Sequence, residues 1–335
     1  MRIAIDAMGG DFAPANVVGG ALIAGRYLGI GLILVGPADL IGRELERHKG
    51  VADLDLSVVD APDVIGMSEL PVESLRRKRD SSLKVAMDLV ASGEASAVVT
   101  VGNTGAAVMA AHQVFGLLPG VDRPALATRI PTRRRDAVLL DSGANLECRP
   151  KHLLQFARMG VLYAKIAFNL EQPRVGLLSI GEEQTKGNAL TREAYRLFEA
   201  SQLNFSGNID ARELFTGDVD VIVCDGFTGN IALKVSEGLV DVIEALLQEE
   251  LSSTFTAKLG FLVSRHAYRR LQKRVDYSEY GGAPLLGAEG LCIIGHGQSS
   301  VKAIRNAIVT ASRFTKCDLI GSFKKEILSS NTIKS

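Results

Sequence analysis

The stretch VDVIVCDGFTGN, residues 219–230, contains the pattern from which most of the chain is built. Its first half is almost wholly apolar, which suits a central strand of a parallel sheet that is covered on both faces. Its second half is rich in Gly, Thr, Asn and Asp, the residues typical of a loop that leads into a helix. The stretch therefore predicts a strand, a loop and a helix in that order, which is the repeating unit of an α/β fold.

The same order of elements occurs six times in the 335 residues. The other five apolar runs and the loops that follow them are Arg2–Asp6 before AMGGDFAP, 97–101 before GNTG, 137–141 before SGANLECRP, 174–180 before GEEQTKGN, and 291–295 before HGQSS. Further strands are expected at Gly31–Gly36 and 55–59. Because such loops leave the carboxyl ends of parallel strands, where ligands bind beside helix N-termini, we predict a site at one edge of the sheet.

Composition and charge exclude several classes of protein. Lys plus Arg and Asp plus Glu both number 38, so no overall charge attracts nucleic acid or an anionic bilayer. The four cysteines lie far apart with no C-x-x-C spacing, which argues against a zinc site or a disulfide framework and fits a reducing cytoplasm. No apolar stretch approaches the roughly 20 residues of a membrane span, and Asp6 interrupts any signal sequence.

Residues 236–275 break the alternation of strands and helices, and we expect a projecting helical hairpin there, inserted into one catalytic domain over residues 1–325 with a C-terminal tail at 326–335. One apolar stripe at helical spacing supports the first helix: Leu239, Ile243, Leu246, Leu247 and Leu251. Gly260 is expected to break the helix within an apolar patch at the tip. No acidic residue occurs between Leu251 and Val275.

The basic side chains of this segment leave two alternatives open. They are Arg265, Arg269, Arg270, Lys273 and Arg274. In one, the hairpin forms a dimer and its basic flank is solvated. In the other, the flank docks an acidic partner while the apolar tip contacts a membrane surface or another subunit.

The loops after the strands are candidates for anion binding, since glycine lets the backbone N–H groups approach a ligand closely. None is a Walker A sequence or a G-x-G-x-x-G fingerprint, and each alone reads as a tight turn with a helix cap. Several such loops at one edge favour a phosphate or acyl-phosphate site.

Four further candidates for chemistry are weighed against structural roles. Lys186 can bring a cation to an oxyanion, or it can be a solvated lysine. His296 can be a general acid toward the leaving thiolate or a hydrogen-bond donor to phosphate, or it can be a loop histidine held by backbone bonds. Cys224 can be a nucleophile or a small buried hydrophobe. Four strand-end aspartates can ligate Mg²⁺ or cap helices: Asp6, Asp11, Asp141 and Asp225. Phosphate is already nucleophilic, so its attack on an acyl group needs no metal or other cofactor.

The motifs IAIDAMGGDFAP, VGNTGA, DSGAN, GEEQTKGN, CDGFTGN and YGGAPLLGAEG followed by HGQSS occur in this order up to about residue 315. With them the chain resembles the phosphate acyltransferases of bacterial phospholipid synthesis. The resemblance implies a Rossmann-like, three-layer α/β/α sandwich related to isocitrate dehydrogenase and phosphotransacetylase. It also implies transfer of a long-chain acyl group from acyl-carrier protein to inorganic phosphate.

The resemblance further implies a homodimer formed through the hairpin, and peripheral contact with the membrane or a membrane acyltransferase. Acyl-carrier protein is strongly acidic, so it is the expected partner of the basic flank. The residues expected to contact the membrane are Leu259, Phe261, Leu262 and Val263. Lys186 and Asn230 are expected to polarise the thioester carbonyl and hold phosphate. The remaining loop residues are expected to line the pocket: Asp6, Gly9, Gly10, Asp11, Asn103, Thr104, Ser142, Asn145, Thr228 and His296.

Three rival functions remain at this point. A phosphotransacetylase acting on short acyl-CoA shares the phosphate chemistry but needs no basic face for a protein donor. An NAD-dependent dehydrogenase fits the α/β pattern, but the dinucleotide fingerprint is absent. A non-catalytic membrane scaffold would use the hairpin alone.

Overall fold

The computed structural model describes residues 1–330, whose strands form two sheets. The first sheet has seven strands in the order β3-β2-β1-β4-β12-β11-β5. Their bounds are β1 Arg2–Asp6, β2 Gly31–Gly36, β3 Leu56–Asp60, β4 Ala97–Thr100, β5 Ala125–Leu126, β11 Ala283–Leu286 and β12 Cys292–Ile294. Strands β3, β2, β1, β4 and β12 are parallel, whereas β11 runs antiparallel to both of its neighbours.

The second sheet has five strands in the order β6-β7-β10-β8-β9. Their bounds are β6 Thr128–Ile130, β7 Ala137–Leu140, β8 Val175–Ser179, β9 Phe205–Asp210 and β10 Val221–Val223. Only β6 is antiparallel, to β7. All six predicted strand-loop-helix units are confirmed, as are the two further strands, but they belong to two sheets and not to one edge of a single sheet.

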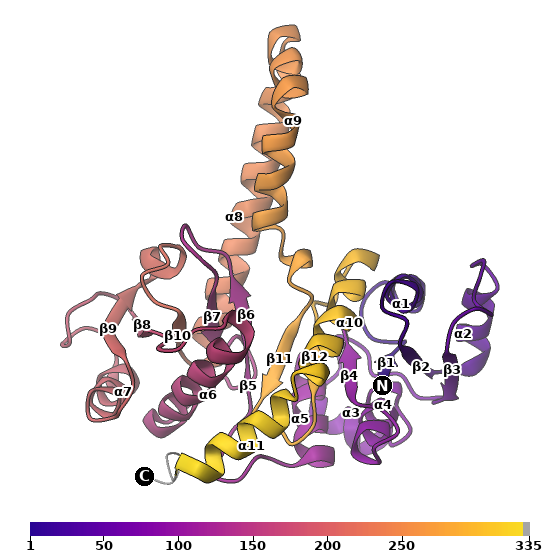
Figure 1. Ribbon diagram of the computed structural model, residues 1–335, viewed down its shortest axis with the longest axis horizontal. Helices are drawn as coiled ribbons and strands as arrows, with labels where there is room; N and C mark the ends of the chain where they lie inside the picture. Colours follow the sequence, from indigo (N-terminus) through magenta and orange to yellow (C-terminus); the bar gives the residue numbers. More distant parts are fainter. Residues whose placement is uncertain (331–335) are drawn as a thin grey trace.

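Helices cover both faces of each sheet, which confirms the predicted three-layer sandwich (Figure 1). On the first sheet, α1, α2 and α10 pack on one face and α3, α4 and α5 on the other. On the second sheet, α6 and α7 pack on one face, and η1 with the first turns of α8 on the other. The helix bounds are α1 Ala15–Leu28, α2 Ala38–Leu45, α3 Pro71–Arg77, α4 Ser82–Ala91, α5 Thr104–Phe115, α6 Pro150–Phe168, α7 Ala189–Glu199, η1 Ala211–Phe215, α8 Gly226–Ser253, α9 Phe255–Val275, η2 Tyr277–Glu279, α10 Val301–Lys316 and α11 Leu319–Ser330.

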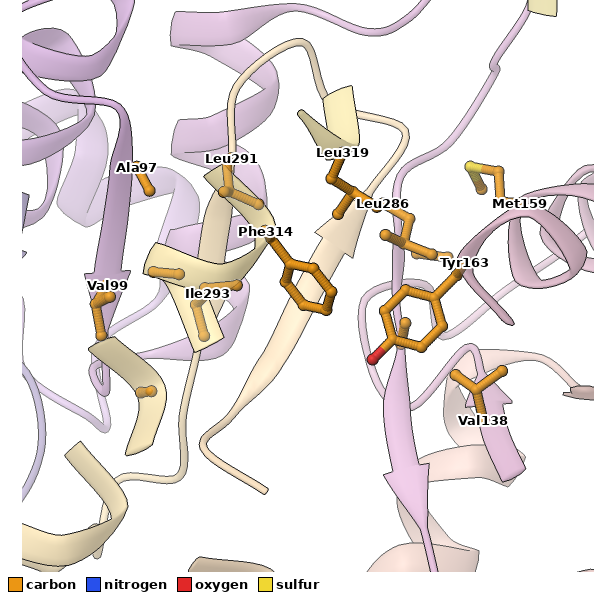
Figure 2. Packing of buried hydrophobic residues seen from close by; sticks show 14 of the residues in the cluster. Ala97, Val99, Val138, Met159, Tyr163, Leu286, Leu291, Ile293, Phe314 and Leu319 are labelled. Carbon is orange, nitrogen blue, oxygen red and sulfur yellow. The ribbon is translucent and has the colours of Figure 1, made fainter. Parts of the chain in front are cut away.

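The two sheets share one hydrophobic core at their junction. Figure 2 shows the ring of Phe314, from α10, between Ile293 of the first sheet and Tyr163 of α6, which covers the second sheet. The Phe314 and Tyr163 rings meet edge to face with centroids 5.6 Å apart, a favourable aromatic geometry. Both side chains are almost fully buried, so the two sheets are held in one body.

The hairpin of α8 and α9 projects from this body (Figure 1). It differs from expectation in two ways. Helix α8 starts at Gly226, ten residues before the expected 236, and Gly260 lies inside α9, so the predicted break there is wrong. One glycine costs a helix only about 1 kcal/mol relative to Ala, which a long helix tolerates. The chain turns instead at Thr254, whose hydroxyl caps α9, and Phe255 at the tip is 82% exposed.

The expected C-terminal tail is also partly helical. Helix α11 continues to Ser330, and Ile327 within it is buried against the common core. Residues 331–335 of the expected tail lie outside the described residues.

A buried ion pair fixes the amino end of the second sheet. Asp220, 1% exposed, accepts hydrogen bonds from the backbone N–H of Arg174 at 2.9 Å, from the Arg174 guanidinium at 3.1 Å and from Nε of Arg135 at 2.9 Å. Burial alone would raise the pKa of Asp220, but the hydrogen bonds from Arg174 outweigh it and the pKa is lowered. The stabilisation is therefore present above the unfolded-state pKa and is lost as the pH falls through the folded-state value.

Replacing Asp220 with Asn should lower the free energy of unfolding by about 3 kcal/mol, because it leaves two guanidinium groups without their buried anion. Urea unfolding at neutral pH measures this. The matched control is Asp218→Asn, whose pair with Arg134 is exposed and should change stability by about 0.5 kcal/mol or less. Equal effects of the two substitutions would contradict the assignment.

Candidate active site

A buried carboxylate organises the loop after β7. Oδ1 of Asp141 accepts hydrogen bonds from the N–H of Leu126 at 2.9 Å and of Ala144 at 3.1 Å. Oδ2 accepts from the N–H and the side-chain amide of Asn145, at 2.7 and 2.8 Å. Burial raises the pKa of Asp141, while these donors oppose the rise. These bonds fix the loop that carries Ser142 and Asn145. The side chains of both residues make hydrogen bonds within the protein, since the Ser142 hydroxyl also pairs with that of Thr128 at 2.7 Å.

The N-terminus of α8 packs against this loop. Asp225 caps the helix, accepting from both the N–H and the hydroxyl of Thr228 at 2.8 and 2.9 Å. The N–H of Gly226 donates to the Asn145 carbonyl at 2.8 Å. A Cβ on Gly229 would lie 1.9 Å from the Asp141 carbonyl oxygen, so only glycine permits this approach.

This approach brings the Asn230 side chain beside Gly143. A Cβ added to Gly143 would lie 3.6 Å from the Cβ of Asn230. Within residues 1–330 the Asn230 amide makes no hydrogen bond, so its polar atoms are available to a ligand. The N-terminus of a helix of 28 residues adds a positive electrostatic potential there.

The loop between β8 and α7 carries Lys186. A turn closes it, with the N–H of Lys186 donating to the Glu183 carbonyl at 2.9 Å, and the same carbonyl accepts from Nδ2 of Asn208 at 3.0 Å. Asn188 caps α7, as the predicted helix start requires. The Lys186 side chain is exposed and, in the described part of the chain, its ammonium group has no hydrogen bond or ion pair.

A cavity of about 1420 Å³ joins the Lys186 loop to the start of α8. Ser179, Gly187 and Asn188 line it on one side, and Asp225 and Thr228 line it on the other. Ser179 Oγ is a buried hydroxyl without a hydrogen-bond partner in residues 1–330. The polar end of the cavity is thus formed by the start of α8 and by the loop after β8; Lys186 and Asn230 belong to these two segments but are not among the residues that line the cavity. A helix N-terminus and a nearby lysine suit an anion and a carbonyl oxygen that becomes negative.

The remaining predicted residues form a second group on the first sheet. There Asp6 accepts from the hydroxyls of Ser82 at 2.6 Å and Thr100 at 2.7 Å, and burial raises its pKa. Asn103 caps α5 and donates to the carbonyls of Met67 and Glu69. None of the group lines the cavity: Asp6, Gly9, Gly10, Asp11, Asn103, Thr104 and His296.

Contacts within this second group are mainly between loops. The N–H of Asp11 donates to the Gly297 carbonyl at 2.8 Å, and a Cβ on Gly9 would lie 2.7 Å from the Gly102 nitrogen. His296 is exposed, and its Nδ1 accepts from the N–H of Gln298 at 3.2 Å. The group forms a compact junction at the carboxyl ends of β1, β4 and β12.

Only some of the basic residues of α9 line the cavity. Arg269, Lys273 and Arg274 line it, whereas Arg265 and Arg270 are exposed elsewhere on the helix. Arg274 is held at the base of the hairpin, where its guanidinium donates to the carbonyls of Thr132 at 2.7 Å and of Arg133.

Two alternatives from the sequence fit this geometry poorly. Cys224 is 2% exposed, and burial raises its pKa well above the ordinary value, which disfavours a thiolate nucleophile. As for a metal role of the aspartates, no group of three or more His, Cys, Asp or Glu side chains that could hold an ion occurs within residues 1–330.

Sequence reasoning missed Ser179 and Asn208. Ser179 is the last residue of β8 and lies one residue before the end of the predicted run 174–180, and the position near a carboxyl end was a usable signal. Asn208 lies in β9, whose sequence FSGNID is polar and contains glycine, so no strand pattern marked it.

Comparison with known proteins is consistent along the whole chain. A family model described as "Fatty acid synthesis protein" matches residues 1–321. The phosphate acyltransferase of Geobacter sulfurreducens is 49% identical over 316 residues, which are 94% of this chain and 91% of that protein. That of Pelotomaculum thermopropionicum is 48% identical over 327 residues, 98% of this chain and 95% of that protein.

Solved structures agree at the level of the fold. A phosphotransacetylase from Streptococcus pyogenes superposes with a TM-score of 0.61 at 18% identity, covering 94% of each chain. EutD phosphotransacetylase from Staphylococcus aureus gives 0.58 at 16% identity, also covering 94% of each.

Proposed function

The chain belongs to the fatty acid synthesis protein family and is a relative of the phosphate acyltransferases, and on this basis we propose that it transfers a long-chain acyl group from acyl-carrier protein to inorganic phosphate for phospholipid synthesis. The observation that carries the proposal is the 49% identity over 94% of the chain. The cavity with its polar end supports it, because that end offers donors for both phosphate and a thioester carbonyl.

In the reaction, an oxygen of HPO₄²⁻ attacks the thioester carbonyl carbon. A C–O bond forms and the carbonyl oxygen becomes an oxyanion. The C–S bond then breaks, and the proton of the phosphate passes to the sulfur. The products are an acyl phosphate and the free thiol of the carrier protein, so atoms and charge balance without any further reactant.

Lys186 and Asn230 have the two electrophilic roles in this proposal. The ammonium group neutralises charge on the phosphate and the developing oxyanion, and the amide of Asn230 donates a hydrogen bond beside the α8 N-terminus. Donors fixed before the reaction stabilise the oxyanion most effectively. Thr228, fixed by Asp225, and Ser179 complete the polar lining.

Carrier protein is proposed as the donor because the basic residues of α9 lie at and beyond the cavity. Arg269 and Lys273 line it, and Arg265 and Arg270 extend the basic surface along the helix. An acidic protein would be steered to such a surface, whereas a short acyl-CoA would not need it.

The direct test is release of carrier-protein thiol from purified palmitoyl-carrier protein, with and without phosphate, beside an equal concentration of palmitoyl-CoA. Phosphate-dependent release from the carrier protein is expected. Release of thiol from CoA alone would favour a phosphotransacetylase, and no release from either donor would favour a scaffold. Binding of NAD would point to a dehydrogenase.

We also propose that the hairpin forms a homodimer and reaches a membrane surface. Helix α9 has no buried residue, and many apolar side chains of both helices are exposed. Within residues 1–330, no helix is long and apolar enough to cross a bilayer. Leu259, Leu262 and Val263 are more than half exposed, while Phe261 packs on Tyr268 with centroids 5.3 Å apart. Phe255 at the tip joins them as a membrane candidate.

Asn208 is proposed as a positioning residue for Lys186, because both bond to the Glu183 carbonyl. Asn208→Ala should lower kcat about tenfold with little change in KM for the acyl donor, since a misplaced cation weakens transition-state binding. The control is Asn204→Ala. Asn204 immediately precedes β9, and its side chain donates an exposed hydrogen bond to the Gln172 carbonyl. Equal kcat values for both variants would contradict the role.

A further inference from the structure

An apolar ladder runs along α8 from the polar end of the cavity. Ile231, Val235, Leu239 and Ile243 are spaced four residues apart, and all four line the cavity. They are 46, 65, 58 and 53% exposed, so the described part of the chain leaves about half of each side chain uncovered. The ladder begins three residues after Thr228, at the polar end.

The opposite walls of the cavity add further apolar side chains beside the basic residues of α9. Leu214 and Phe215 of η1 face it from the second sheet, with Ile180 at the end of β8. Leu271 and Val275 of α9 line it from the hairpin. Apolar side chains from η1, from the end of β8 and from both hairpin helices thus border one space that opens onto a polar end.

We propose that this cavity binds the acyl chain of the substrate and that the α8 ladder sets the length of chain accepted. The inference rests on the proposed function and adds a chain-binding site and specificity-determining residues to it. The thioester carbonyl would lie near Thr228 and the Lys186 loop, and the hydrocarbon would run along α8 toward the hairpin.

The dimensions suit a long chain. At about 1.5 Å of rise per residue, Val235 lies about 10 Å along α8 from Thr228 and Ile243 about 22 Å. With C–C bonds of about 1.5 Å, an extended acyl chain advances about 1.3 Å per carbon. Val235 therefore corresponds to about eight carbons and Ile243 to about seventeen, close to the end of a palmitoyl chain.

A second hairpin is the main competing occupant of this apolar surface. Two other exposed apolar residues of α8, Val242 and Leu246, lie outside the cavity and leave a separate surface for a second copy. The polar end is the stronger argument for an acyl chain: a partner helix has no use for a helix N-terminus and for the Ser179 hydroxyl, unpaired among the described residues, at the end of its groove.

The experiment measures kcat/KM with octanoyl-, dodecanoyl- and palmitoyl-carrier protein at fixed phosphate. Val235→Trp should lower the palmitoyl-to-octanoyl and the dodecanoyl-to-octanoyl ratios by about tenfold or more, because the added ring blocks the groove near its middle. Ile243→Trp should lower only the palmitoyl-to-octanoyl ratio. The matched control is Val242→Trp, which puts the same ring on the same helix outside the cavity and should leave both ratios as in the wild type.

Unchanged ratios in both groove variants, or equal ratios in Val235→Trp and Ile243→Trp, would overturn the inference. A loss of dimerisation in Val235→Trp by analytical ultracentrifugation, with unchanged ratios, would assign the surface to a second copy. The wild type separates this inference from the proposed function: absence of phosphate-dependent turnover with every donor refutes the function, whereas wild-type turnover with insensitive variants refutes the groove alone.

Discussion

Replacing Lys186 with Ala is expected to lower kcat/KM for phosphate-dependent thiol release by about a hundredfold to a thousandfold, a loss typical of removing one donor to an oxyanion. The loop that carries Lys186 borders the cavity, and its ammonium group has no partner within the described residues. Within residues 1–330 no carboxylate pairs with this charge, so it is available to phosphate and to the oxyanion.

The fold should survive this substitution, because the side chain is exposed and makes no contact on which packing depends. Thermal unfolding of the variant should match that of the wild type. Lys165→Ala, which removes an exposed lysine from α6, is the control and should keep full turnover. Near-normal turnover of folded Lys186→Ala protein would remove Lys186 from the mechanism.

Gly229→Ala is expected to lower the free energy of unfolding by about 3 kcal/mol and turnover by more than tenfold. The new methyl group would lie 1.9 Å from the Asp141 carbonyl oxygen and 3.0 Å from Cys224 Sγ. The nearest neighbour is backbone and cannot swing aside, so the start of α8 must retreat from the loop. Asn230 and Thr228 would move with it.

The matched control for Gly229 is Gly238→Ala in the same helix. A Cβ there has no neighbour within 4 Å, and Ala favours a helix by about 1 kcal/mol over Gly, so the control should be neutral or slightly stabilising. Urea unfolding and turnover of both variants give the comparison. Equal behaviour would show that the close approach of α8 to the Asp141 loop is unimportant.

Much of the fold could be predicted because six strands are apolar runs followed by loops that start helices. The division into two sheets could not. It depends on short strands such as β5, Ala125–Leu126, which pairs with β11 about 160 residues later in the chain. Such strands have no local pattern, since their partners define them.

The candidate site was predictable to the same degree. Asn230 and Thr228 follow the most regular strand; the structure places Asn230 beside the Asp141 loop, and Thr228 lines the cavity. The residues near Asp6 follow an equally regular strand but lie on the other sheet, which sequence order alone did not reveal. The walls of the cavity come from η1, β8 and both hairpin helices, so no single stretch marks them.

The error at Gly260 has a different cause. A glycine was read as a helix break, but the penalty is small beside the stability of a helix of 21 residues, and the turn lies where Thr254 can cap α9.

The measurement that tests the central claim most directly is ³¹P NMR of the wild-type protein incubated with palmitoyl-carrier protein and inorganic phosphate. The account predicts a new acyl phosphate resonance that grows in step with free carrier-protein thiol, while inorganic phosphate falls by the same amount. Release of thiol with no phosphorus-containing product would mean hydrolysis, and would contradict transfer of the acyl group to phosphate.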